Sequence, residues 1–236
     1  MRMRLRVWTD RKWWRVGGAV LLLGLSGCGA DTPPTPPTSS YGSSSYDYGY
    51  GDSSQEISFL NDAPSQAAPE VGLFDITLTD LQGAQAKVSD FAKGRSIVLV
   101  VTRGNTDPVC PYCSTQTAHY IRDYAKFADK NAEVVLVYPV AEKGDESRWS
   151  RFLEDVRGRL TDPTETVPFP VVFDVQLAAV DKLGIRKDLS KPATYIVDPE
   201  GTVRYAYVGA TWVDRPSTAA VLAELDALGK SDAAGE

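Results

Sequence analysis

The chain has 236 residues, of which 43% are hydrophobic and 24% are charged, and its formal net charge is −6. This length and composition suit one globular domain with additional segments, and they exclude a collagen, a coiled coil and a wholly disordered chain. The charge is uneven, because residues 1–27 carry a net +5 and the remaining residues a net −11. An acidic mature chain argues against nucleic-acid binding, whose affinity comes largely from neutralising phosphates.

The first 27 residues have the features of a secretory signal. A basic segment from Met1 to Arg15 precedes an apolar run over residues 16–25. This run is shorter than the roughly 20 apolar residues that a membrane-spanning helix needs. We therefore expect a cleaved signal peptide rather than a permanent membrane anchor.

The end of the signal, Leu25-Ser26-Gly27-Cys28, resembles the lipobox of bacterial lipoproteins. The resemblance implies that Cys28 is lipidated and becomes the mature N-terminus, so that acyl chains hold the exported protein on a membrane. The residue after Cys28 is Gly29 and not the Asp that retains such lipoproteins at the inner membrane. This favours the outer membrane, facing the periplasm, in a Gram-negative host. The alternative is an ordinary signal peptide with an incidental cysteine.

The segment from Cys28 to residue 69 is predicted to be a disordered tether. Residues 31–38 are rich in proline, and residues 39–54 are almost entirely Ser, Tyr, Gly and Asp. Neither stretch has the apolar periodicity that buries a core. A flexible chain of this length reaches about 35 Å root-mean-square, which suits a spacer. An alternative role is stacking of its tyrosines on a glycan or the cell wall.

Residues 70–229 are predicted to form one α/β domain, followed by a flexible tail over residues 230–236. A hairpin is expected within residues 75–89, and the β-branched run 96–102 is typical of a strand buried on both faces. A helix at 113–130 and a buried strand at 132–138 complete a βαβ unit with parallel strands. The remaining predicted elements are a helix at 146–158, a strand at 169–173, a helix at 176–183, strands at 194–197 and 203–208, and a helix at 216–228.

The motif Cys110-Pro111-Tyr112-Cys113 lies between the first buried strand and the helix that follows it. Unpaired amides and a partial positive charge at a helix N-terminus favour a thiolate. We therefore expect Cys110 to be the exposed nucleophile and Cys113 the more buried resolving thiol. Pro111 would fix the first helical turn, and Pro111 and Tyr112 together would influence the reduction potential.

Three other interpretations of the two cysteines compete. A structural disulfide across so short a loop restricts the unfolded chain little. A zinc site needs four ligands, and His119 is the only histidine. A c-type haem site needs His directly after the second Cys, where Ser114 stands. We expect no metal and no other cofactor.

The order of predicted elements resembles the thioredoxin superfamily, and within it the redoxin group of TlpA/ResA-type thiol–disulfide oxidoreductases and AhpC/TSA peroxiredoxin-like proteins. The resemblance rests on the Cys-x-x-Cys motif together with Pro192-Ala-Thr-Tyr-Ile-Val-Asp198, and it covers about residues 70–229. It implies a thioredoxin-like α/β fold, a central mixed sheet flanked by helices, with an N-terminal hairpin and an inserted helix.

The resemblance also implies roles for individual residues. Cys110 matches the attacking cysteine and Cys113 the resolving one. Pro192 matches the cis-proline that faces the disulfide and offers backbone groups to a bound substrate chain. Lys191 takes the preceding position, which often tunes specificity.

The chain departs from the family pattern at several positions. Val109 replaces the aromatic residue usual before the first Cys of the oxidoreductases. Asp107 and Arg103 stand where peroxiredoxins have Thr or Ser and Pro, and Pro192 stands where they have a peroxide-orienting Arg. Arg103 is a candidate substitute charge beside Cys110, or alternatively an ion-paired loop residue. Asp107 would raise the Cys110 pKa if it lay close.

These observations favour an exported, membrane-tethered thiol–disulfide oxidoreductase that exchanges disulfides with partner proteins. The alternative is a peroxiredoxin-like peroxide reductase, in which Cys110 is peroxidatic and Cys113 resolving. A third possibility is a non-enzymatic binding module with a structural disulfide. The expected partners are protein thiols and disulfides or a peroxide, a reducing thiol protein, and the membrane through the Cys28 anchor.

Overall fold

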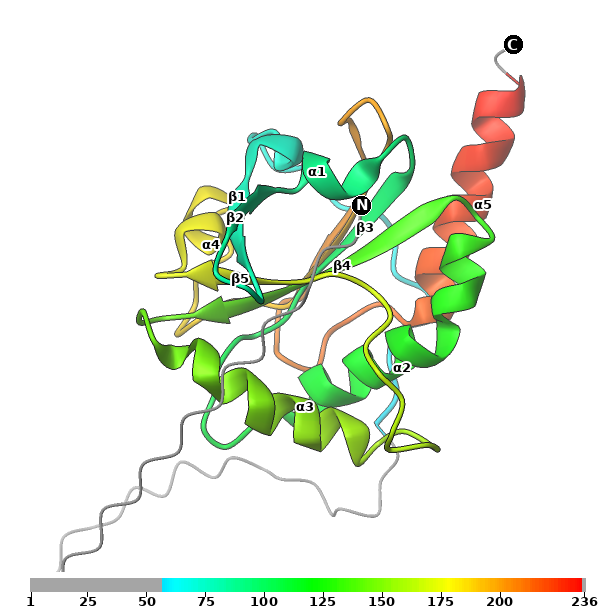
Figure 1. The fold of residues 1–236 in the computed structure, drawn as a ribbon. Helices are drawn as coiled ribbons and strands as arrows, with labels where there is room; N and C mark the ends of the chain where they lie inside the picture. Colours follow the sequence, from blue (N-terminus) through cyan, green and yellow to red (C-terminus); the bar gives the residue numbers. More distant parts are fainter. Residues whose placement is uncertain (1–56, 235–236) are drawn as a thin grey trace, which may run out of the picture. The chain divides into compact units, whose positions relative to one another are not determined.

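The computed structural model describes residues 57–234 (Figure 1). The predictions for the signal peptide, for Cys28 and for tether residues 29–56 lie outside these residues. Among the described helices, none combines the length and the apolar character needed to cross a bilayer.

Seven strands form one mixed sheet in the order β2-β1-β5-β4-β3-β6-β7. The three central strands, β5, β4 and β3, are parallel, and every other pair is antiparallel. This confirms the predicted parallel unit and the mixed sheet, and the hairpin pairs Thr77 with Lys87. The strands are β1 (Thr77–Asp80), β2 (Gln85–Lys87), β3 (Ser96–Val101), β4 (Ala132–Val140), β5 (Val171–Val175), β6 (Ala193–Val197) and β7 (Val203–Val208).

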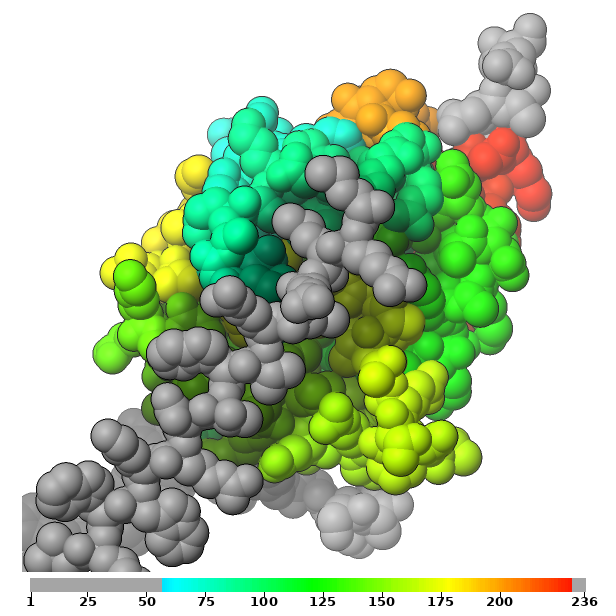
Figure 2. All heavy atoms as spheres, in the orientation of Figure 1, coloured from blue at the N-terminus to red at the C-terminus, as the bar shows by residue number. Residues whose placement is uncertain are grey.

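Helices cover both faces of the sheet (Figure 1). One face carries α2 (Pro111–Ala128), α3 (Trp149–Arg157) and α5 (Thr218–Ala234), with the 3-10 turn η2 (Asp145–Arg148) leading into α3. The other face carries η1 (Leu73–Asp75), α1 (Ser89–Ala92) and α4 (Ala178–Lys182). The helix α5 packs beside α2, and their residues, red and green, adjoin in Figure 2.

The alternation of side chains along β3 explains why both faces are covered. Val98 and Val100 enter the apolar cluster beneath α2, whereas Ile97 and Leu99 enter the cluster beneath α1 and α4. All four side chains are buried. Successive residues of a strand point to opposite faces, so a β-branched run without polar positions requires two apolar layers.

The inserted helix packs on the sheet through aromatic side chains. Trp149 and Phe152 of α3 have ring centroids 5.4 Å and 5.0 Å from that of Tyr138 on β4. Trp149 also stacks edge-on against Phe173 of β5. The apolar stripe expected at residues 146–158 therefore packs α3 against the sheet, beside α2.

Most element ends lie close to those expected, and two boundaries differ more. The helix α5 continues to Ala234 instead of ending at residue 228. Part of the expected tether packs on the domain: Leu60 bridges to Pro216, Tyr205 donates a hydrogen bond to the Ala63 carbonyl at 2.9 Å, and the Gln66 N–H donates to β7. Residues 60–66 thereby cover a sheet edge that would otherwise leave backbone groups unpaired.

Candidate active site

The two cysteines lie at the start of α2, which begins where the loop after β3 ends. Cys110 is the N-cap residue, and its carbonyl accepts hydrogen bonds from the Cys113 and Ser114 N–H groups at 3.1 and 3.2 Å. Both cysteines are free thiols. The expectation of an exposed Cys110 is wrong, because Cys110 packs in the apolar cluster and is only 4% exposed, while Cys113 is 0% exposed. Cys110 is still the less buried of the two residues.

A buried arginine that the sequence analysis did not identify completes the site. Arg215 follows β7 in the loop before α5, and its side chain is fully buried. Its Nη2 lies 3.1 Å from Cys113 Sγ and 4.0 Å from Cys110 Sγ. Nη1 donates to Gln116 Oε1 at 2.6 Å, and Nε donates to the Trp212 carbonyl at 2.8 Å. No local pattern around Arg215 could have linked it to a motif 105 residues earlier.

The position of Arg215 is set by contacts of its own backbone and of the residues that follow it. The Leu60 N–H donates to the Arg215 carbonyl, and the Ser217 N–H donates to the Leu60 carbonyl. At the next residue, the Thr218 hydroxyl donates to Asp123 of α2 at 2.6 Å. The start of α5, directly after the loop that carries the guanidinium, is therefore held to α2, which begins at the thiols.

The electrostatics of the pair favour one thiolate. Burial raises the pKa of Cys113, but the hydrogen bond from Cys110, the charge of Arg215 and the Arg103 backbone N–H outweigh burial and lower this pKa to about 6. The hydrogen bond to Cys113, burial and the charge of Cys113 together raise the pKa of Cys110. The two sulfurs thus share one proton near neutral pH, with the negative charge favoured on Cys113.

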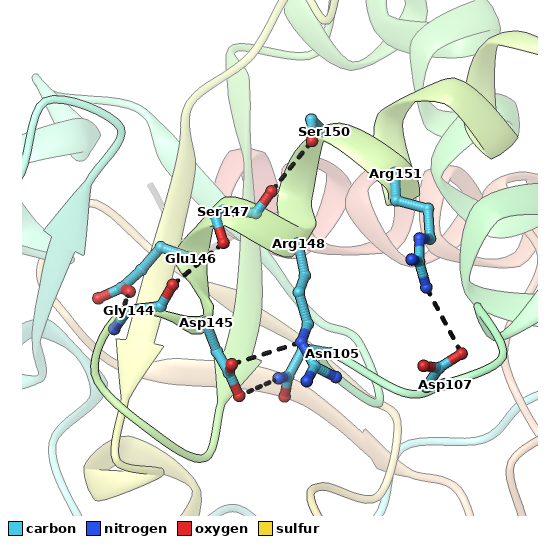
Figure 3. Close-up of polar contacts among 9 residues, drawn as sticks. All are labelled: Asn105, Asp107, Gly144, Asp145, Glu146, Ser147, Arg148, Ser150 and Arg151. Atoms are coloured by element: carbon cyan, nitrogen blue, oxygen red, sulfur yellow. Dashed lines mark hydrogen bonds and ion pairs between the residues drawn. The ribbon is translucent and has the colours of Figure 1, made fainter. Parts of the chain in front are cut away.

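The loop between β3 and Cys110 is anchored to the inserted segment (Figure 3). The Asn105 side chain donates to Asp145 at 2.7 Å, and Arg151 pairs with Asp107 at 3.5 Å. Gly104 has φ of +106°, and a Cβ there would lie 2.5 Å from the Pro139 carbonyl oxygen. Glycine is required at this position, because a side chain would strain the backbone and push the loop away from β4.

Arg103 and Asp107 do not place their charges at the sulfurs. The Arg103 guanidinium pairs with Asp188 at 3.5 Å and lies over the Trp212 ring at 4.7 Å. Asp107 is an exposed residue paired with Arg151. Arg103 is thus an ion-paired loop residue, and the positive charge beside the thiols belongs to Arg215.

The cis-proline implied by the resemblance is absent at residue 192. The one cis peptide bond in residues 57–234 joins Asp107 to Pro108, and the Lys191–Pro192 bond is trans. Pro192 accepts a hydrogen bond from the Gly209 N–H at 2.9 Å, which continues the pairing of β6 with β7 on an extended trans backbone. The Lys191 N–H donates to the Ile185 carbonyl.

The remaining residues that the sequence analysis considered are Pro111, Tyr112 and His119. Pro111 occupies the first turn of α2, as expected, and the partly buried Tyr112 packs against the apolar cluster that contains both cysteines. His119 stacks edge-on against Phe59, with ring centroids 5.4 Å apart. The histidine that the zinc interpretation required therefore faces the N-terminal segment.

Comparison with known proteins identifies relatives of this fold. The family model AhpC/TSA matches residues 65–206. A mitochondrial 2-Cys peroxiredoxin from Plasmodium falciparum is 18% identical, with a TM-score of 0.55. The match covers 70% of this chain and 96% of the peroxiredoxin chain. The C45S mutant of peroxiredoxin 6 from Arenicola marina is 15% identical, with a TM-score of 0.59, and the match covers 71% of this chain and 76% of the mutant chain. AhpC from Mycobacterium tuberculosis is 20% identical, with a TM-score of 0.52, and the match covers 71% of this chain and 96% of the AhpC chain.

A search of curated proteins finds no match. The structural similarities, at identities below 25%, establish the thioredoxin-like fold. The family model extends over more than half of the chain and includes both cysteines, although it ends before Arg215. The chain therefore belongs to the AhpC/TSA family of thioredoxin-like oxidoreductases.

Proposed function

We propose that this protein reduces peroxides with the Cys110–Cys113 pair. The observation that carries the proposal is the buried guanidinium of Arg215 beside both sulfurs at the start of α2. A fixed cation stabilises the attacking thiolate and, through its N–H groups, the negative charge that develops on the leaving oxygen. Membership of the AhpC/TSA family supports peroxide as the substrate.

The proposed reaction begins at Cys110, the more exposed sulfur. Transfer of the shared proton to Cys113 leaves a Cys110 thiolate, which attacks a peroxide oxygen. The O–O bond breaks, Cys110 becomes a sulfenic acid, and the departing oxygen takes up a proton. The Cys113 sulfur then attacks the sulfenic sulfur, a disulfide forms and water leaves. A dithiol reductant returns two electrons to the pair.

The test of this function follows peroxide and thiols together. In a Cys28→Ser background only the two site thiols remain. One equivalent of hydrogen peroxide is expected to consume both thiols within seconds at micromolar protein, giving one intramolecular disulfide by mass spectrometry. Survival of the thiols for many minutes would contradict peroxide reduction.

Disulfide exchange with partner proteins remains the second candidate. The hydrogen bond between the two sulfurs supports it, because a mixed disulfide at Cys110 would have its resolving thiol beside it. This function predicts fast oxidation of the reduced pair by a protein disulfide together with slow oxidation by peroxide. The same variant, treated with each oxidant in turn, distinguishes the two functions.

We also propose that the protein is exported and held on a membrane by a lipid at Cys28, with residues 29–56 as part of its tether. The lipobox sequence and the short apolar run support this proposal. Cys28→Ser is expected to move the protein from the membrane fraction to the soluble extracytoplasmic fraction or to leave its signal uncleaved. Unchanged processing and unchanged membrane association would contradict lipidation.

A further inference from the structure

Every hydrogen-bond acceptor of the Arg215 guanidinium is neutral unless a cysteine ionises. The acceptors are the Trp212 carbonyl, the Gln116 side-chain oxygen and the two sulfurs. Among the side chains that the structure describes, residues 57–230, no carboxylate lies within ion-pair distance of this guanidinium. The half-buried Arg95 shows the usual arrangement in this chain, since it pairs with the buried Glu133 at 2.6 Å.

A fully buried cation needs a nearby negative charge, because transfer from water to the protein interior is unfavourable for an unpaired ion. The phenols of Tyr120 and Tyr138 do not meet this need at pH 7, since burial raises the pKa of both. A thiolate of the cysteine pair is then the anion within reach of Arg215.

We propose that the singly ionised Cys110–Cys113 pair is the counter-ion of Arg215, and that Gln116 is a positioning residue that holds Arg215 there without neutralising it. Oxidation to the disulfide removes the counter-ion and leaves the buried guanidinium unpaired. The disulfide is therefore easily reduced, and the dithiol is the stabilised form. This inference deepens the proposed function, because it rests on a redox-active pair and assigns the favoured direction of its regeneration.

The location of Gln116 explains how it acts through Arg215. It lies on α2 three residues after Cys113 and is buried. Its bond to Nη1 turns the other terminal nitrogen, Nη2, toward Cys113 at 3.1 Å. A carboxylate at this position would have the same shape but would supply the negative charge that the thiolate otherwise supplies.

The redox step balances with glutathione as the reductant. Two glutathione thiols give two electrons to the protein disulfide and become glutathione disulfide. The protein S–S bond breaks to give one thiol and one thiolate. Of the two protons released by glutathione, one binds to the pair and the other goes to solvent. The equilibrium constant of this reaction measures how strongly the structure favours the reduced pair.

The decisive measurement is this equilibrium constant at pH 7 in the full chain with Cys28→Ser. Gln116→Glu is expected to shift the equilibrium toward the disulfide by about tenfold or more, the factor that corresponds to one pKa unit. Gln82→Glu, the same chemical change at an exposed turn residue, is the matched control and is expected to leave the constant unchanged. An equilibrium for Gln116→Glu within twofold of the parent would overturn the proposal.

A second variant keeps the test decisive if Gln116→Glu alone disturbs folding. Arg215→Met removes the cation and is also expected to favour the disulfide. In that background the further change Gln116→Glu should have no additional effect, because it acts through Arg215. A tenfold effect that persists without Arg215 would contradict the proposal. None of these measurements uses peroxide, so their outcome is independent of whether the pair proves to be a peroxidase.

Discussion

With Cys113→Ser, hydrogen peroxide is expected to convert Cys110 to a sulfenic acid that persists, whereas Cys110→Ser is expected to slow oxidation of the remaining thiol by about a thousandfold or more. Cys110 is the more exposed sulfur. Its hydrogen bond to Cys113 is the largest cause of its raised pKa, and the serine variant removes the competing thiolate. Cys110 should therefore remain reactive when Cys113 is absent, but should lack a partner for disulfide formation.

Stopped-flow fluorescence gives the rate of this reaction, and a sulfenic-acid-specific reagent followed by mass spectrometry identifies the oxidised residue. Both variants are made in the Cys28→Ser background so that one thiol remains in each. Rapid reaction of Cys110→Ser, with the oxygen found on Cys113, would reverse the two roles. That outcome would mean that the negative charge favoured on Cys113, rather than exposure, selects the nucleophile.

Replacing Arg215 by methionine is expected to raise the pH at which the cysteine pair first ionises by about one to three pH units, the usual effect of removing an opposite charge at this distance. The pKa of Cys113 lies at about 6 with Arg215 present. Alkylation should therefore rise as pH increases through about 6 in the parent and through a higher pH in Arg215→Met. The thiolate fraction at pH 7 then falls by roughly two- to a hundredfold.

The measurement is the pH dependence of iodoacetamide alkylation, read together with the rate of peroxide consumption. Arg215→Lys retains a positive charge and should recover part of the shift, although it lacks the planar donors that reach Gln116 and Trp212 together. Arg186→Met removes an exposed arginine paired with Asp181 and serves as the control. An unchanged alkylation profile in Arg215→Met would show that Arg215 does not set the ionisation of the pair.

The fold could be predicted from the sequence because the residues of each central strand and helix show a pattern typical of that element. The β-branched run of β3 requires apolar layers on both faces, and the following helix and strand require a parallel crossover. The Cys110–Cys113 spacing likewise predicts two sulfurs within one helical turn. Element ends were less predictable. The helix α5 extends to Ala234, beyond the apolar positions that were used to predict its end.

The class of the domain and the position of the two thiols follow from the sequence alone, since both depend on patterns over neighbouring residues. Which cation lies beside the two thiols depends on the packing of distant segments. Arg103, near in sequence, pairs with Asp188, while Arg215, distant in sequence, reaches both sulfurs. Charge stabilisation depends on distance in space and on burial, and both are set by the packing of residues 60–66, α2 and α5 around the loop that contains Arg215.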